Sequence, residues 1–223
     1  MRDAENIRKV EQLFTLHSSL FTFWMGFIFY PKSSRYVSER PEYLPTKCKR
    51  VGVFVNEEVE NIKKIADDYA LDFIQLHGHE TPEQISHLSK ATGRRDSGNL
   101  LTSHLSIIKA FNIATKEDLE KTAPYADLAD YFLFDTKGPS AGGNGEKFDW
   151  SILDAYNGDT PFLLSGGIGP DDAERILRST SGRSQGENYH HPKCIGIDLN
   201  SRFEIEPGIK DIIKLKMFLN YGK

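Results

Sequence analysis

The chain has 223 residues, 39% of them hydrophobic, which is enough to bury one sizeable core. Its formal net charge of −4 at pH 7 excludes the basic face typical of nucleic-acid binders, and no apolar run reaches the roughly 18 residues of a membrane span. Cys48 and Cys194 lie far apart and indicate neither a disulfide framework nor a metal site. Because no basic segment followed by an apolar one opens the chain, we expect a cytoplasmic protein with a single domain, residues 1–223.

Short apolar runs alternate with helical patterns along the whole chain. A helix is predicted at the start, with Asp3 as its N-cap and with Ile7 and Val10 on one apolar face, and the last helical pattern runs from Ile209 to Phe218. The apolar runs are nearly continuous, as in strands that are covered on both faces. They lie at 26–30, 51–55, 73–76, 106–111, 131–134, 161–164 and 194–198. The alternation predicts an α/β fold with a parallel sheet, at a size common for one barrel of strands and helices.

Polar and glycine residues gather where the apolar runs end, which is the edge that carries the active site in barrels of this kind. Gly166 and Gly167 follow one run, and their backbone N–H groups can approach an anion closely because glycine has no Cβ. Asp198, Asn200 and Ser201 follow the next run, which would be its neighbour in a barrel. The pattern predicts a phosphate site between the two loops, with an ordinary tight turn as the alternative.

Two further charged residues follow apolar runs. Asp135 ends the run 131–134, where a carboxylate is costly unless it is solvated or has a task. It is a candidate proton donor near neutral pH, and a structural carboxylate bonded to the glycine-rich segment 141–145 is an equal alternative. Arg35 follows the run 26–30 and has the forked geometry that binds a carboxylate through two hydrogen bonds, although a surface arginine is the more common case.

Six blocks of sequence carry a resemblance to a known family, in order from about Met25 to the C-terminus. They are GFIFYPKSSRYV at 26–37, VGVFVN at 51–56, LDFIQLHG at 71–78, FDTKGPSAGGNGEKFDW at 134–150, LSGGI at 164–168 and DLNSRFEIEPGIKD at 198–211. The chain resembles the phosphoribosylanthranilate isomerases. The resemblance implies a TIM (β/α)8-type barrel that needs no cofactor or metal. It also implies a small phosphorylated substrate as the partner, and we expect a monomer, with a homodimer as the alternative.

The reaction implied by the resemblance is an Amadori rearrangement in tryptophan biosynthesis. N-(5-phosphoribosyl)anthranilate becomes 1-(2-carboxyphenylamino)-1-deoxy-D-ribulose 5-phosphate. Asp135 matches the general acid, which protonates the ribose ring oxygen and opens the ring to a Schiff base; a cysteine at the end of the first strand then removes the C2′ proton. Arg35 matches the residue that holds the anthranilate carboxylate, while Gly166, Gly167 and the segment 198–201 match the phosphate loops.

The chain departs from the family at its start. The family begins with a strand ending Lys-x-Cys-Gly, and this sequence starts at the segment that follows it, MRDAEN at 1–6. Cys48 and Cys194 precede or begin their strands, so neither can replace the missing base. We therefore expect a barrel whose first strand is absent or replaced, with the apolar segment 14–23 near the gap, and an impaired activity. The alternative is an inactive barrel that still binds phosphorylated ligands. Another phosphate-binding barrel, indole-glycerol-phosphate synthase, fits less well, because this sequence shows neither the catalytic lysine pair nor the longer N-terminal extension of that enzyme.

Overall fold

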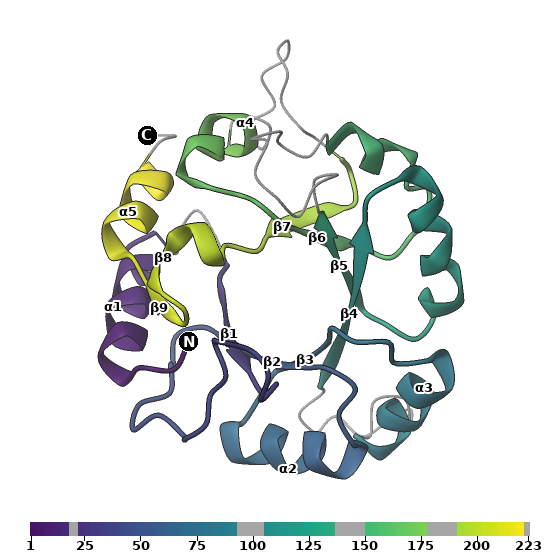
Figure 1. Cartoon of the computed structure of the whole chain (residues 1–223), viewed down its shortest axis with the longest axis horizontal. Coiled ribbons are helices and arrows are strands. Elements are labelled where there is room, and N and C mark those ends of the chain that lie inside the picture. The colour runs from purple at the N-terminus through teal and green to yellow at the C-terminus, as the bar shows by residue number, and fades with distance from the viewer. Residues whose placement is uncertain (18–21, 93–104, 137–149, 178–190, 221–223) are drawn as a thin grey trace.

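A computed structural model describes residues 1–17, 22–92, 105–136, 150–177 and 191–220. Seven parallel strands form one sheet in chain order, each strand pairing with the next. The strands stand around the middle of the molecule and the helices lie outside them (Figure 1). The strands are β1 (Trp24–Ile28), β2 (Lys49–Phe54), β3 (Phe73–Leu76), β4 (Ser106–Ile113), β5 (Tyr131–Thr136), β6 (Phe162–Ser165) and β7 (Cys194–Ile197). All seven predicted strands are confirmed, with bounds that differ by two residues or fewer.

Helices and short 3-10 segments connect the strands. Helix α3 shows why they begin where they do: the Thr81 side chain accepts from the backbone N–H of Gln84, whose own side chain accepts from the Thr81 N–H, and Pro82 stands in the first turn. The predicted N-cap Asp3 is confirmed, since its carboxylate accepts from the Asn6 N–H at 2.6 Å. The elements are α1 (Ala4–Thr15), α2 (Val59–Tyr69), α3 (Pro82–Ala91), η1 (Lys116–Tyr125), η2 (Trp150–Ala155), η3 (Pro170–Asp172), α4 (Ala173–Leu177), η5 (Ser201–Phe203) and α5 (Ile212–Asn220).

A small hairpin, β8 (Glu204–Glu206) with β9 (Ile209–Lys210), precedes the last helix. The prediction that a helix begins at Ile209 is wrong, because Gly208 has a positive φ of 86° and turns the chain back on itself. Helix α5 begins at Ile212 instead. Among the described residues, no helix is long and apolar enough to cross a membrane.

The sheet has an apolar layer on each face. The larger layer lies between the strands and the helices and holds side chains such as Phe132, Phe134 and Phe162. The smaller one lies on the inner face and contains Val51, Phe73, Ile108, Ala110 and Leu133. At the N-terminal ends of the strands, the rings of Trp24 and Phe73 stack at 4.1 Å and Tyr131 packs edge-on against both. These rings fill that end of the interior, so ligand chemistry belongs at the other end.

The sheet is not closed in the described residues, because β1 and β7 are its two edges and do not pair with each other. The backbone nitrogen of Met1 lies beside the β1 edge and donates to the Gly26 carbonyl at 2.7 Å. The structure tests the predicted placement of 14–23 near the gap only in part, because residues 18–21 lie outside the described part. The two ends of this segment meet, since Phe14 stacks on Phe23 at 4.8 Å against the outer core. Helix α1, the first element, packs on α5, the last one, so the two ends of the chain lie side by side (Figure 1).

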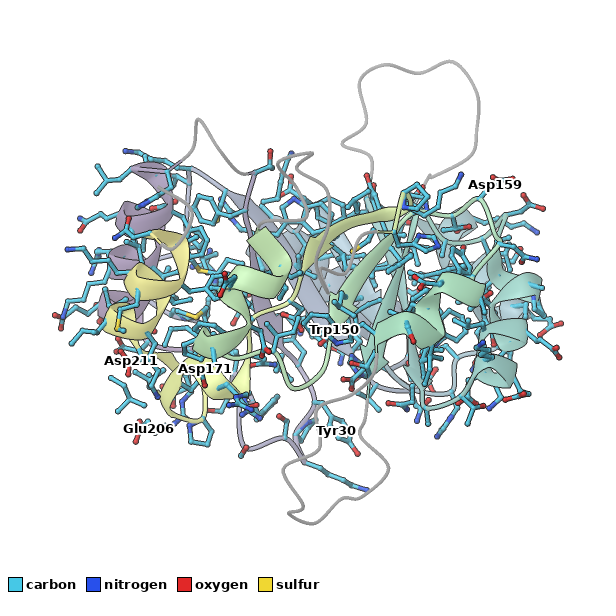
Figure 2. All side chains as sticks on the ribbon, turned by 90° about the horizontal axis from the view of Figure 1, so that it is seen from above. Tyr30, Trp150, Asp159, Asp171, Glu206 and Asp211 are labelled. Carbon is cyan, nitrogen blue, oxygen red and sulfur yellow. The ribbon has the colours of Figure 1, made fainter. Side chains whose placement is uncertain are left out.

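Figure 2 shows which end of the barrel carries the loops that follow the strands. Tyr30 after β1, Asp171 after β6 and Glu206 after β7 all lie toward the lower edge of that view. Asp159, which precedes β6, lies toward the opposite edge. A parallel sheet puts all its C-terminal strand ends on one face, and the predicted site residues follow strands, so they share that face.

Candidate active site

Polar side chains replace apolar ones on the inner face of the sheet as the strands approach their C-terminal ends. Side chains alternate between the two faces of a strand, so Asp135 and Ser165 continue the inward series of Leu133 and Leu163. Asp135 is in register with Ser165 on β6 and with Asn112 on β4. The result is a row of polar groups around the C-terminal end of the barrel, which we call its mouth. The stacked rings of Trp24, Phe73 and Tyr131 fill the opposite end.

Asp135 has a specific neighbour in this row. The Nε2 atom of His77, which follows β3, lies 3.7 Å from Oδ2 of Asp135, and both side chains are partly exposed. The other ring nitrogen of His77, Nδ1, lies 3.0 Å from the side-chain nitrogen of Gln75. The glycine-rich segment 141–145, the alternative partner of Asp135, lies outside the described residues. A carboxyl group at the mouth with an imidazole beside it suits proton transfer to a bound ligand.

The two glycines after β6 have the backbone conformations that only glycine adopts readily, with φ of 95° at Gly166 and 65° at Gly167. A Cβ at Gly166 would lie 2.1 Å from the Thr136 carbonyl oxygen, whereas a Cβ at Gly167 would meet open space. Neither glycine N–H donates to an acceptor within the described residues. The tight turn and the anion site are therefore compatible interpretations, because the turn leaves both N–H groups without an acceptor among the residues that the structure describes.

The loops after β6 and β7 are in contact, as the sequence analysis expected. Arg202 in the second loop packs on Gly169 in the first, so closely that a Cβ on that glycine would lie 2.4 Å from the arginine Nε. Asp198 accepts a hydrogen bond from the Ser165 hydroxyl at 3.0 Å, and its own N–H donates to the Leu164 carbonyl at 2.8 Å. Asp198 therefore has no free N–H for an anion, and its carboxylate connects the two strand ends.

Asn200 and Ser201 have different surroundings. Lys210 donates to the Asn200 carbonyl at 3.2 Å, to its side-chain oxygen at 3.1 Å and to the Leu199 carbonyl at 3.0 Å, so a partly buried ammonium holds this loop in place. Ser201 is exposed at the start of η5, and its N–H donates to no acceptor in the described part of the chain. Burial lowers the pKa of Lys210, although Glu204 and Asp198 oppose the shift.

Arg35 lies on the same face but is already engaged. Its Nε and Nη2 donate to the Glu204 carboxylate at 2.6 to 3.0 Å, and Lys210 reaches the same carboxylate at 3.3 Å. Burial would raise the pKa of Glu204, but the hydrogen bond from Arg35 and the charge of Lys210 outweigh it and lower that pKa. The sequence analysis missed Glu204 and Lys210, which stand in the block 198–211 with no spacing that marks them as a network.

A second buried ion pair was also missed. Lys109 on β4 points to the outer face, where it donates to Glu80 at 3.0 Å and to the Gly78 carbonyl at 2.8 Å. Glu80 in turn accepts from the Asn56 and Gly78 N–H groups, so the pair fixes the segments that follow β2 and β3. Burial lowers the pKa of Lys109, with Glu80 opposing the shift. This pair lies behind the sheet and supports the mouth without facing it.

Neither cysteine is at the mouth. Cys48 immediately precedes β2 and Cys194 begins β7, so both stand at the N-terminal ends of strands. Burial raises the pKa of Cys48 to about 12 and raises that of Cys194 as well, so both thiols stay protonated at neutral pH. Within the described ranges, no group of three or more His, Cys, Asp or Glu side chains is arranged to hold a metal ion.

Parallel strands curled into one sheet, helices outside and polar groups at the C-terminal strand ends define an enzyme of the (β/α)8-barrel class. The family model of N-(5′-phosphoribosyl)anthranilate (PRA) isomerase matches residues 4–221. The N-(5′-phosphoribosyl)anthranilate isomerase of Parabacteroides distasonis is 48% identical over 225 residues, which cover 98% of this chain and 89% of that protein. The chain therefore belongs to the PRA isomerase family.

Solved structures agree with this assignment. A phosphoribosylanthranilate isomerase in complex with reduced 1-(o-carboxyphenylamino)-1-deoxyribulose 5-phosphate has a TM-score of 0.66 at 28% identity, covering 99% of this chain and 96% of that one. The isomerase of Thermotoga maritima also has a TM-score of 0.66, at 31% identity, and covers 96% of this chain and 93% of that one. The predicted family and the predicted TIM-barrel class are confirmed.

Proposed function

We infer that this chain is an isomerase that converts N-(5-phosphoribosyl)anthranilate to 1-(2-carboxyphenylamino)-1-deoxy-D-ribulose 5-phosphate in tryptophan biosynthesis. The observation that carries this inference is the family match over residues 4–221 together with Asp135 at the mouth of the barrel. Asp135 is the general acid. It gives its proton to the ribose ring oxygen, and the ring opens as the anilino nitrogen forms a C=N bond.

Binding of the anthranilate carboxylate is the task of Arg35. A guanidinium has five N–H donors, and Glu204 takes the edge formed by Nε and Nη2. The N–H groups of Nη1 and the second one of Nη2 form another edge, which suits a second carboxylate. Glu204 then fixes the orientation of Arg35 before the substrate arrives, so less side-chain entropy is lost on binding.

The phosphate is held by N–H groups of Gly166, Gly167 and Ser201. Asp198 and Asn200 keep the second loop in place through Ser165 and Lys210. Arg202 supplies a positive charge on the same pair of loops, and its ion pair with the exposed Asp171 is long, 4.0 Å. An Arg202→Gln variant should bind inorganic phosphate and the reduced product analogue more weakly, as measured by calorimetry, with Arg40→Gln on another loop as the control.

A polypeptide of residues 1–223 should turn over slowly, because both described cysteines are protonated and lie at the far end of the barrel. A positioned general base contributes about 10²- to 10⁴-fold, so a residual rate is expected. This polypeptide should still bind the product analogue. An inactive barrel that only binds phosphorylated ligands would bind it too, so the residual turnover distinguishes the two possibilities. Full activity from residues 1–223 would show that another residue at the mouth serves as the base.

The decisive experiment compares Asp135→Asn with Asp159→Asn by the change in fluorescence as the anthranilate adduct is consumed. Asp159 is fully exposed at the opposite face, so its variant controls for the loss of a charge. Both substitutions are made in residues 1–223 and in the same chain preceded by a strand ending Cys-Gly. We expect the added strand to raise turnover and Asp135→Asn to remove it. Equal rates for the two asparagine variants would contradict the assignment of the acid.

A cytoplasmic location and a monomeric or homodimeric state stay predictions.

A further inference from the structure

The inner face of β3 carries a glutamine, Gln75, two positions before His77 of the mouth. Gln75 is buried, and its side-chain nitrogen lies 3.0 Å from Nδ1 of His77. An amide nitrogen can donate hydrogen bonds but cannot accept them. Nδ1 must therefore accept with its lone pair, and in a neutral ring the proton is then on Nε2.

That proton points toward the general acid. Nε2 of His77 lies 3.7 Å from Oδ2 of Asp135, which is longer than a hydrogen bond but within reach of a small rotation of either side chain. The other tautomer would present a lone pair to a carboxylate, and the contact would be repulsive. The tautomer thus decides whether His77 stabilises or destabilises the ionised form of Asp135.

We propose that Gln75 is a positioning residue of the isomerase reaction, which holds His77 in the neutral Nε2–H tautomer as a hydrogen-bond donor to Asp135. The proposal rests on the function proposed for Asp135. In the ring-opening step the Asp135 proton moves to the ring oxygen, the C1′–O bond breaks with its electron pair going to that oxygen, and the nitrogen lone pair forms the C=N bond. Asp135 becomes a carboxylate, which the Nε2–H of His77 then stabilises; His77 gives up no proton.

Neutrality of the ring matters as much as the position of its proton. An imidazolium 3.7 Å from Asp135 would favour the carboxylate before the reaction and so deplete the acid. Gln75 opposes this, because an Nδ1–H would face its N–H group. The nearby Lys109 and Glu80 form an ion pair on the outer face of the sheet, so their two charges offset each other there. Further around the mouth, Asp198 is bonded to Ser165.

The tautomer can be read directly from the ring ¹⁵N shifts and long-range ¹H–¹⁵N couplings of the labelled chain, and two other histidines serve as references. Nδ1 of His191 accepts from the Lys193 N–H at 3.1 Å, so this ring is the Nε2–H reference. Nδ1 of His17 lies 2.9 Å from the Leu13 carbonyl and must carry a proton, while its Nε2 lies 3.2 Å from the Asn220 side-chain oxygen, so this ring is a reference for a protonated Nδ1 and not for a neutral tautomer. We expect the His77 pattern to match that of His191. An Nδ1–H pattern at His77 would overturn the proposal.

Two variants test the role of Gln75. In Gln75→Glu the carboxylate accepts from Nδ1, so both ring nitrogens of His77 should carry protons at neutral pH. In Gln75→Leu the ring should show a mixture of tautomers. Unchanged signals of His17 and His191 show that each variant folds. If the His77 signals stay unchanged in both variants, Gln75 does not set the tautomer.

Turnover then tests the positioning role. It is measured on residues 1–223 or on the same chain preceded by a strand ending Cys-Gly, whichever is active in the fluorescence assay. We expect Gln75→Glu to lower kcat by about 10-fold or more with KM little changed, because the acid is depleted while the binding groups are intact. A changed tautomer with an unchanged kcat would refute the positioning role alone. If Asp135→Asn also kept its activity, the proposed function of Asp135 would fail, and the two failures are thus distinguishable.

Discussion

Replacing Glu204 with glutamine removes the anion that joins the loop after β1 to the hairpin after β7. The carboxylate side chain is only 4% exposed and receives hydrogen bonds from Arg35, from Lys210 and from the Gly208 N–H. The two cations are 24% and 13% exposed, so water compensates little of what they lose. The Glu204→Gln variant therefore leaves two partly buried positive charges without their counter-ion.

The expected cost is about 3 kcal/mol, at the lower end of the range for breaking a buried ion pair, since glutamine still offers one acceptor oxygen. In a chain of this size that corresponds to a fall in Tm of roughly 6–12 °C. The effect should depend on pH. The pKa of Glu204 is lower in the folded than in the unfolded chain, so its contribution is present above the ordinary value of 4.5 and is lost as the pH falls through the folded pKa.

Urea unfolding followed by circular dichroism at pH 7 and in acid measures both effects. Asp159→Asn is a matched control, because it breaks an ion pair of similar length, 3.0 Å to Lys193, whose carboxylate is fully exposed. We expect the control to behave as the parent at both pH values, and Glu204→Gln to approach the parent in acid. A loss below about 1 kcal/mol at pH 7 would mean that the network is solvated and does not hold these loops together.

Two further substitutions test other features of the mouth. Gly166→Ala should lower Tm more than Gly167→Ala: both positions have positive φ, but only the first Cβ would collide with the Thr136 carbonyl. Equal melting temperatures would show that the backbone conformation alone sets the cost. Lys109→Met should cost about 3–5 kcal/mol in urea unfolding because it leaves the buried Glu80 unpaired, and adding Glu80→Leu should restore part of the loss. A double variant no more stable than the single one would contradict that reasoning.

Most of the strands were predictable because the sheet carries an apolar layer on each face, although Ile195 of β7 is exposed. A strand such as β6 is almost uniformly apolar and needs no alternating pattern to be recognised. The glycines after it were predictable for a similar reason, since a positive φ restricts the residue type. In both cases the local environment alone limits which residues fit.

The ion network around Glu204 was not predictable in that way. Arg35 and Glu204 are 169 positions apart, and nothing in either neighbourhood indicates that the two side chains meet. Their contact depends on the curvature of the whole sheet, which brings the loops after its two edge strands together. The same holds for His77 and Asp135, which face each other across the mouth from different strands. Ile209 was misplaced because the apolar spacing of 209–218 was followed back past the turn that Pro207 and Gly208 mark.

The contact between helix α1 and the hairpin has a consequence for biosynthesis. Asn6 exchanges two hydrogen bonds of 2.8 Å with the backbone of Lys210, 204 positions later in the chain. Early partners of this helix, such as the Thr46 and Lys47 N–H groups that donate to Glu11, are made soon after it. In a chain that emerges from the ribosome N-terminus first, its C-terminal partners come some 200 positions later. During that time the apolar face of α1, with Ile7 and Leu13, has nothing from the C-terminal segment to pack against. We expect ribosome-bound chains that stop before α5 to be captured by chaperones or cleaved by proteases at this helix.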